Sequence, residues 1–261
     1  MSQILDITTE KRKASTRKFC SHYSLTIVVA VLNERDNLTS FCHSIDRLFS
    51  DYGMTCEVVV VNDGSSDGSR PLLEELSHQF SFLKILDHAY PKGLTHVLKT
   101  ATQNIESDWI YLTAADLESD IYTDLPHLIS AHIPGDTAIA GWRQDRGDHK
   151  KFASAIANGF CRIGFGLNIH DMNWVKLVRT EAICTLPLEL VTHRYILAVL
   201  SGLGGHIREV PVQWHARQAG RSKFGRRRLW SSAVEFTKLW FWFQFRGRWL
   251  LPNITVLSSP L

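Results

Sequence analysis

The sequence of 261 residues predicts an α/β fold with an open, doubly wound and mostly parallel sheet flanked by helices. Two observations predict it: short apolar runs alternate with longer stretches of helical period, and polar segments containing glycine follow several of these runs. Strands that alternate with helices build parallel βαβ units, because each helix returns the chain to the same edge of the sheet.

The first half of the chain carries this alternation most clearly. Its expected strands are residues 25–31, 56–61, 82–86 and 109–113, and its expected helices are residues 35–52, 70–79 and 94–104. The second half is less regular. It contains an apolar stretch punctuated by glycine at 152–167, expected strands at 174–178 and 206–214, and an expected helix at about 194–200.

Three segments follow from these patterns. Residues 1–23 have mixed charge and no periodicity, and we expect a flexible basic N-terminal tail. Residues 24–228 form the predicted domain. Residues 229–261 are rich in Trp and Phe but are interrupted by charged residues, which predicts an amphipathic helix at an interface rather than a membrane span of about 20 residues. The alternative is that these aromatic side chains pack on the domain core.

Composition and charge distribution limit which kinds of partner and which cellular compartment we expect. The net charge is only +3, but basic residues cluster at 11–18 and 217–228, which favours anionic phosphate or membrane partners over nucleic acid. Solvated basic surfaces are the alternative. The five cysteines show no CxxC spacing, and the N-terminal residues have no apolar signal-like core. We therefore expect a cytoplasmic protein that is peripheral to the cytosolic face of a membrane.

Polar residues follow several of the expected strands. A doubly wound sheet binds its ligands at these positions, beyond the carboxyl ends of its strands. Asn33 and Glu34 follow the first strand, residues 62–68 follow the second, and Asp116 and Glu118 follow the fourth. Asp63 is expected to hydrogen-bond a base or a ribose, although Asp-Gly-Ser also occurs in simple Asx-turns.

Two further groups suit phosphate chemistry. Asp116 and Glu118 are two residues apart, so extended backbone would project both carboxylates the same way, toward one hard cation. A helix N-terminus that favours acidic residues is the alternative. Residues 217–228 combine arginine, lysine and glycine directly after an expected strand, a composition that suits phosphate groups.

Taken together, these motifs resemble glycosyltransferase family 2, in particular its dolichol-phosphate mannose synthase and polyprenyl-phosphate glycosyltransferase branch, over residues 25–228. Residues 31–34 (VLNE) resemble the family's V-Y-N-E segment, and residues 60–68 (VVNDGSSDG) are similar to its VDDGSxDG loop. Residues 141–143 (GWR) stand where the family has GSR. Residues 209–212 (EVPV), followed by Arg217, Gly220, Ser222 and Lys223, are similar to EVPV…R..G.SK.

The resemblance implies a GT-A type, Rossmann-like domain that transfers a sugar with inversion from a GDP- or UDP-sugar to a polyprenyl phosphate. It also implies assistance by Mg2+ or Mn2+ and a role in cell-envelope glycan or glycolipid synthesis. His193 and Arg194 are expected to help close the site. By resemblance the nucleotide-binding residues are Ala30, Leu32, Glu34, Asp63, Gly64, Lys92 and Ala115, and the metal ligands are Asp116 and Glu118. The catalytic residues are Asp116, Arg143, Arg217 and Lys223, and the acceptor-phosphate residues are Arg143, Arg217, Ser222 and Lys223.

Two departures from the family pattern leave alternatives open. Ala114 stands where the family commonly has the first Asp of an Asp-Ala-Asp motif, and residues 171–174 differ from its D..SGFR segment. One alternative is a transferase acting on a saccharide or protein hydroxyl, with a base such as Asp171. The other is a nucleotide-binding homologue with weakened catalysis.

Overall fold

The computed structural model describes residues 2–144, 150–216 and 227–247, with side chains over residues 8–144, 158–216 and 233–245. The strands are β1 Leu25–Val31, β2 Glu57–Asn62, β3 Leu83–Asp87, β4 Trp109–Ala114, β5 Asp136–Gln144, β6 Lys176–Arg179 and β7 His206–Gln213. The helices are α1 Ser2–His22, α2 Arg35–Tyr52, α3 Ser69–Gln79, α4 Leu94–Thr102, α5 Ile121–Ser130, α6 Lys150–Phe165, α7 Thr180–Cys184, α8 Ile196–Gly202 and α9 Arg227–Trp242, followed by the π-helical turn η1 Phe243–Gly247.

The seven strands found in the described residues form one sheet in the order β3-β2-β1-β4-β6-β5-β7. Strands β3, β2, β1 and β4 are parallel neighbours, and β5 pairs in parallel with β7. Strand β6 is antiparallel to both β4 and β5. The predicted mostly parallel sheet is confirmed, and its order reverses at β1, where such sheets open a crevice at the carboxyl ends of the strands.

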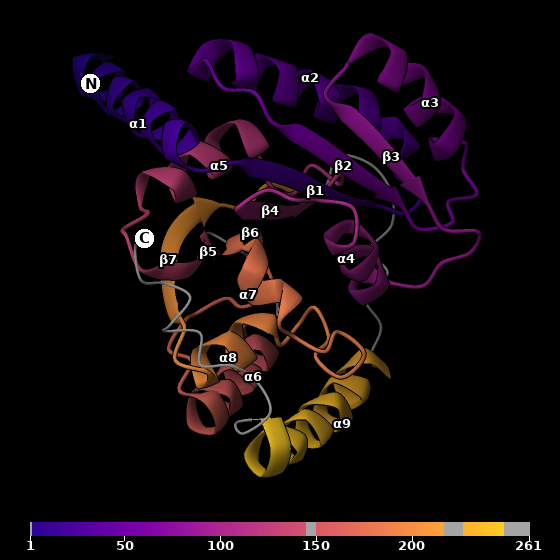
Figure 1. The fold of residues 1–261 in the computed structure, drawn as a ribbon, viewed down its shortest axis with the longest axis vertical. Coiled ribbons are helices and arrows are strands. Elements are labelled where there is room, and N and C mark those ends of the chain that lie inside the picture. The colour runs from indigo at the N-terminus through magenta and orange to yellow at the C-terminus, as the bar shows by residue number, and fades with distance from the viewer. Residues whose placement is uncertain (1, 145–149, 217–226, 248–261) are drawn as a thin grey trace.

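Helices cover both faces of this sheet, as Figure 1 shows. Alternate residues of β1 contribute to the cores on opposite faces of the sheet. Ile27 and Val29 belong to the core with α2, α3 and α5, whereas Val28 belongs to the core with α4, α8 and α9. The runs are apolar throughout because both faces of each central strand are buried. The two cores hold the carboxyl ends of β1, β2 and β4 in fixed positions.

The N-terminal segment differs from the expectation of a flexible tail. Helix α1 packs against α5, with Thr16 and Phe19 buried. Phe19 lies against Tyr23, Trp109 and His132, so a few aromatic contacts fix a helix whose own apolar pattern is weak.

After β4, the structure contains elements that the sequence pattern did not resolve. The apolar stretch at 152–167 forms most of α6. The residues of α5 and β5 were not predicted as a helix or a strand. Helix α9 packs on the core through Leu239, and the turn after it through Phe243, which is fully buried. Phe243 approaches Gly202 so closely that a Cβ there would lie 2.7 Å from its ring. In the described part of the chain, no helix combines the length and the apolar character needed to cross a bilayer.

Candidate active site

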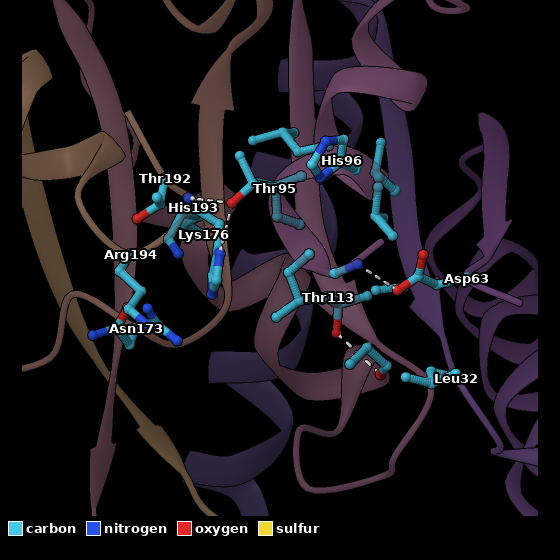
Figure 2. Close-up of a pocket in the computed structure, with 18 of the residues that line it drawn as sticks. Leu32, Asp63, Thr95, His96, Thr113, Asn173, Lys176, Thr192, His193 and Arg194 are labelled. Carbon is cyan, nitrogen blue, oxygen red and sulfur yellow. Dashed lines mark hydrogen bonds between the residues drawn. The ribbon is translucent and has the colours of Figure 1, made fainter. Parts of the chain in front are cut away.

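A pocket of about 820 Å3 opens at the carboxyl ends of β1 and β4. Its floor is formed by residues of β1, β4 and β6, and its walls by α4, the segment 188–194 and α9. Figure 2 shows Leu32 and Asp63 on one side of it and Lys176, Thr192 and His193 on the other. The pocket therefore lies at the topological switch point expected for ligand binding.

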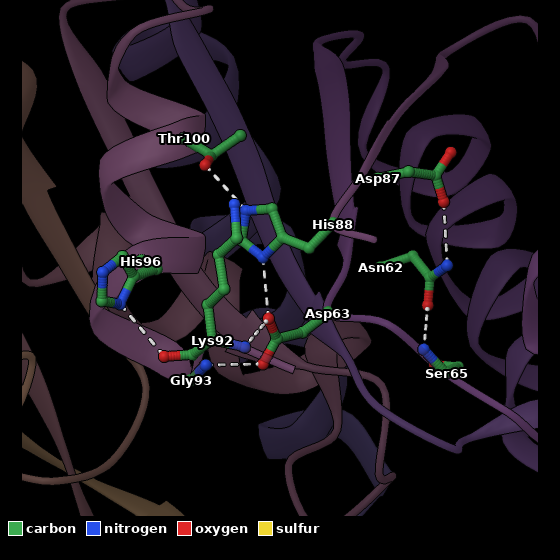
Figure 3. A network of polar contacts seen from close by, with 9 residues as sticks. All are labelled: Asn62, Asp63, Ser65, Asp87, His88, Lys92, Gly93, His96 and Thr100. Carbon is green, nitrogen blue, oxygen red and sulfur yellow. Dashed lines mark hydrogen bonds and ion pairs between the residues drawn. The ribbon is translucent and has the colours of Figure 1, made fainter. Parts of the chain in front are cut away.

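Asp63 organises the first side of the pocket. Its carboxylate accepts hydrogen bonds from the Lys92 and Gly93 backbone N–H groups, both at 2.8 Å, and from His88 Nδ1 at 2.7 Å, as Figure 3 shows. Burial raises the pKa of Asp63, but these hydrogen bonds outweigh it and lower the pKa below its ordinary value. With Nδ1 donating, a neutral His88 ring accepts from the Thr100 hydroxyl at Nε2, 2.8 Å away. Asp63 therefore connects the end of β2 to the start of α4 by hydrogen bonds, and it also lines the pocket.

The loop after β2 is joined to the loop after β1. Asn33 donates from its backbone N–H to Ser65 Oγ at 3.0 Å and accepts from the Ser66 N–H at 2.8 Å. Gly64 has φ +70, and a Cβ there would lie 2.5 Å from the Tyr90 carbonyl carbon. Glycine at this position lets the two loops and the segment before α4 pack together at the pocket rim.

Asp116 and Glu118 both line the pocket, but not through extended backbone. Strand β4 ends at Ala114, and the next residues form a turn in which Leu117 has φ +57. The expectation that strand geometry aligns the two carboxylates was therefore wrong. The turn is joined to the end of the last strand, because the His215 N–H donates to the Glu118 carbonyl at 3.0 Å.

Arg143 lines the pocket from β5 and is held by an ion pair. Its Nε and Nη2 donate to the two carboxylate oxygens of Asp171 at 2.5 and 3.0 Å, and its guanidinium stacks over Trp174 at 4.5 Å. Both charged side chains are only 10% exposed. Glu209 fixes this segment further by accepting from the backbone N–H groups of His170 and Asp171. One edge of the Arg143 guanidinium, formed by Nε and Nη2, is therefore engaged by Asp171, and the charge of Asp171 is already paired.

The far wall connects three elements. Thr95 on α4 lies within hydrogen-bond distance of His193 through both the imidazole Nδ1, at 3.1 Å, and the backbone N–H, at 3.2 Å. Glu235 on α9 accepts from Arg194 at 2.6 Å and from Thr192 at 3.3 Å. Helix α9 thus contributes a wall of the pocket, so this part of the C-terminal segment is built into the domain.

The sequence model of Glycosyl transferase family 2 matches residues 26–185, which is more than half of the chain. The chain belongs to glycosyl transferase family 2. The matched region runs from β1 to the end of α7 and so contains the loops after β1 and β2 and the Asp116 turn.

Two of the relatives found by sequence comparison are named for dodecaprenyl phosphate and for bactoprenol. The chain is 25% identical over 86% of its length to dodecaprenyl-phosphate galacturonate synthase from Rhizobium johnstonii, and spans 68% of that relative. It is 21% identical over 91% of its length to the bactoprenol glucosyl transferase of Shigella phage SfV, and spans 83% of it.

The fold is shared with solved enzymes of the GT-A type. Glucosyl-3-phosphoglycerate synthase from Mycobacterium tuberculosis, solved with Mg2+ and UDP, superposes with a TM-score of 0.64 at 15% identity, covering 87% of this chain and 83% of that one. A further structure of the same synthase holds Mn2+, UDP-glucose and phosphoglyceric acid, with a TM-score of 0.65 at 14% identity, covering 89% of this chain and 84% of that one. At these identities the likeness concerns the fold.

Most of the residues predicted for this family 2 site meet in one pocket. Those that line it are Ala30, Leu32, Glu34, Asp63, Lys92, Asp116, Glu118 and Arg143. Gly64 and Ala115 lie outside its lining, Ala115 being fully buried. Arg217, Ser222 and Lys223 lie outside the described residues. The roles of all these residues stay predictions.

Several residues of the pocket lining were not predicted as site residues, among them Thr95, Trp174, Lys176 and Glu235. Lys176 alone carried a signal, since it is the one charged residue in the apolar run 174–178. The Trp174 indole N–H is buried with no acceptor among the described residues.

Proposed function

We propose that the chain is an inverting glycosyltransferase that moves a sugar from a GDP- or UDP-sugar to a polyprenyl phosphate at a membrane surface. The observation that carries the proposal is the composition of the pocket: its lining holds acidic Asp116 and Glu118 together with cationic Lys176, Arg143 and Arg194, the last two also paired with Asp171 and Glu235. Such a pocket suits a diphosphate leaving group and an anionic nucleophile together.

The donor side is supported by the loops after β1 and β2. Leu32 and Glu34 line the pocket beside Asp63, and the first two stand in the segment that resembles the family's V-Y-N-E motif. Three of the four acceptor positions on the Asp63 carboxylate are used within the protein, which leaves room for one donor from a base or ribose.

Asp116 and Glu118 fit a divalent cation as a pair of hard oxygen ligands. Among the described residues no group of three possible ligands comes together. We therefore propose that Mg2+ or Mn2+ is bound by these two carboxylates with diphosphate oxygens and water completing the shell. A bound cation would neutralise the charge of the departing nucleoside diphosphate.

The acceptor assignment is supported by Asp171. A hydroxyl acceptor needs a base to remove its proton, whereas a phosphate oxygen is already an anionic nucleophile. Asp171 accepts from Arg143 through both oxygens and from the Asn173 N–H at 3.2 Å, so it is poorly placed to act as that base. In the proposed reaction the phosphate oxygen bonds to the anomeric carbon, and the bond from that carbon to the nucleoside diphosphate breaks.

The basic segment 217–226 is proposed to bind the acceptor phosphate. Arg217 follows His215 by two residues, and His215 is hydrogen-bonded to the backbone of the Asp116–Glu118 turn. The described residues that precede the segment therefore end beside the proposed diphosphate site. This supports the prediction that Arg217, Ser222 and Lys223 contact phosphate.

Contact with a lipid surface is supported by exposed apolar side chains on α6, α9 and η1. Phe160 and Phe236 of α6 and α9 are neighbours, and Figure 1 shows the two helices at the same end of the molecule. The side chains that remain exposed there are Phe160, Ile163, Val234, Phe241 and Phe245. We propose that they meet the membrane interface, which brings a polyprenyl phosphate to a pocket walled by α9.

The test is direct transfer. Purified protein is incubated with a panel of GDP- and UDP-sugars and undecaprenyl phosphate in detergent with Mn2+, and lipid products are identified by mass spectrometry. A product carrying one sugar per lipid phosphate, absent with the Asp116→Ala variant, is expected. Transfer to a saccharide or to water, with no lipid product for any donor, would contradict the acceptor assignment.

A further inference from the structure

Lys176 is a buried cation on the floor of the pocket. It opens strand β6, where its register neighbours are Leu112 on β4 and Ala140 on β5. The residue is only 7% exposed, yet it lines the pocket. Figure 2 shows it beside Thr192 and His193, across the pocket from Asp63.

The ammonium group of Lys176 makes no hydrogen bond or ion pair with any residue that the structure describes. Burial lowers the pKa of Lys176 to about 8, because desolvation disfavours its charged form more than nearby Asp171 favours it. A charged side chain in such a place normally has a partner, because an unpaired buried charge is strongly destabilising.

Asp171, the acidic group that acts on Lys176, and two glutamates of the pocket lining are already paired with other cations. Asp171 is bidentate to Arg143, and Glu235 accepts from Arg194. Glu189, further along the wall, pairs with a lysine of α4. Lys176 is therefore a positive charge, held inside a cavity, whose counter-charge is not supplied by this part of the wall.

We propose that Lys176 binds a phosphoryl oxygen of a substrate, through hydrogen bonds that its ammonium group donates inside the pocket. The proposal rests on the proposed function, which supplies two sources of that oxygen: the diphosphate of the donor and the phosphate of the acceptor. It adds to the predicted phosphate-binding residues one that comes from the middle of the sheet instead of the loops.

The test compares Lys176→Met with Lys84→Met. Methionine keeps the length of the side chain and removes the charge, and Lys84 is an exposed lysine on β3 paired with Glu57. Isothermal titration with UDP and GDP probes the donor site, and titration with farnesyl phosphate probes the acceptor site. Lys176→Met is expected to weaken one of these two classes about 10- to 100-fold, the range for losing a hydrogen bond to a charged group, whereas Lys84→Met is unchanged.

Unliganded stability separates binding from a structural role. An unpaired buried ammonium replaced by an apolar side chain of similar length is expected to raise the melting temperature of Lys176→Met. A structural role predicts a lower melting temperature together with weaker binding of both probe classes, and that result would overturn the proposal.

A second measurement uses the wild-type protein alone. Its lysines are acylated with and without a saturating probe, and the modification of each is followed by peptide mass spectrometry. Slower modification of Lys176, with Lys84 unaffected, is expected. Equal modification of Lys176 in both conditions would overturn the inference. Wild-type protein that binds neither probe class would refute the proposed function as well, whereas equal binding by wild type and Lys176→Met would refute the inference alone.

Discussion

The Asp63 network offers a sharp test of how the pocket is held together. Asp63 is 3% exposed, and its two oxygens accept three hydrogen bonds at 2.7–2.8 Å. In Asp63→Asn one oxygen becomes an NH2 group that must face an N–H donor. One charged hydrogen bond, about 1.5–3 kcal/mol, is lost and the remaining bonds become neutral ones, so we expect a total loss of about 3 kcal/mol in the free energy of unfolding.

The assay is denaturant unfolding, with the exposed Asp46→Asn on α2 as a control that should leave the midpoint unchanged. The direction of the pKa shift determines how the stabilisation by Asp63 changes with pH. Because folding lowers the pKa of Asp63, its stabilisation is present above the unfolded pKa of about 3.9 and is lost as pH falls through the folded value. The gap between wild type and Asp63→Asn should stay constant above about pH 5 and shrink below about pH 4. A loss under about 1 kcal/mol at pH 7, or a gap that does not shrink in acid, would refute the reasoning.

Three further predictions concern packing, the wall of the pocket and the lipid surface. Gly64→Ala should lower the free energy of unfolding by about 1–3 kcal/mol more than Gly93→Ala, because both glycines have positive φ but only the Cβ at Gly64 meets backbone; equal losses by denaturant unfolding would contradict this. Glu235→Gln should lower the free energy of unfolding by about 1 kcal/mol through its lost ion pair, measured in the same way, and no change would mean that α9 is held by its aromatic contacts alone. Replacing the exposed Phe241 and Phe245 together by Glu should abolish sedimentation with anionic vesicles while leaving the melting temperature within about 2 °C; retained sedimentation would count against the proposed surface.

The sequence predicted the parts of the fold in which local pattern and tertiary environment agree. Strands β1 and β2 are continuously apolar because both their faces are buried, and the helices between them keep a clear helical period. Helix α5 was missed because its 10 residues include a buried Asp124 and an internal proline. Helix α1 was missed because its packing depends on aromatic partners distant in the sequence, which a local pattern does not reveal.

The candidate site shows the same division. Asp63, Glu34 and Asp116 could be predicted because each directly follows a parallel strand, and such positions converge. The arrangement of Asp116 and Glu118 could not, since it depends on the positive φ of Leu117. The charge of Lys176 stands out in its apolar run, but its position in the pocket could not be predicted, because it depends on the antiparallel insertion of β6 between β4 and β5.

The most direct measurement is a calorimetric titration of UDP and GDP into wild type and Asp116→Ala, each with and without Mn2+. The account predicts that one of the two nucleotides binds wild type more tightly when Mn2+ is present, and that this gain is lost in the variant, because Asp116 is a proposed ligand of the cation that meets the diphosphate. Absence of binding by either nucleotide would contradict a nucleotide-sugar transferase, and an equal gain from Mn2+ in the variant would contradict the cation site.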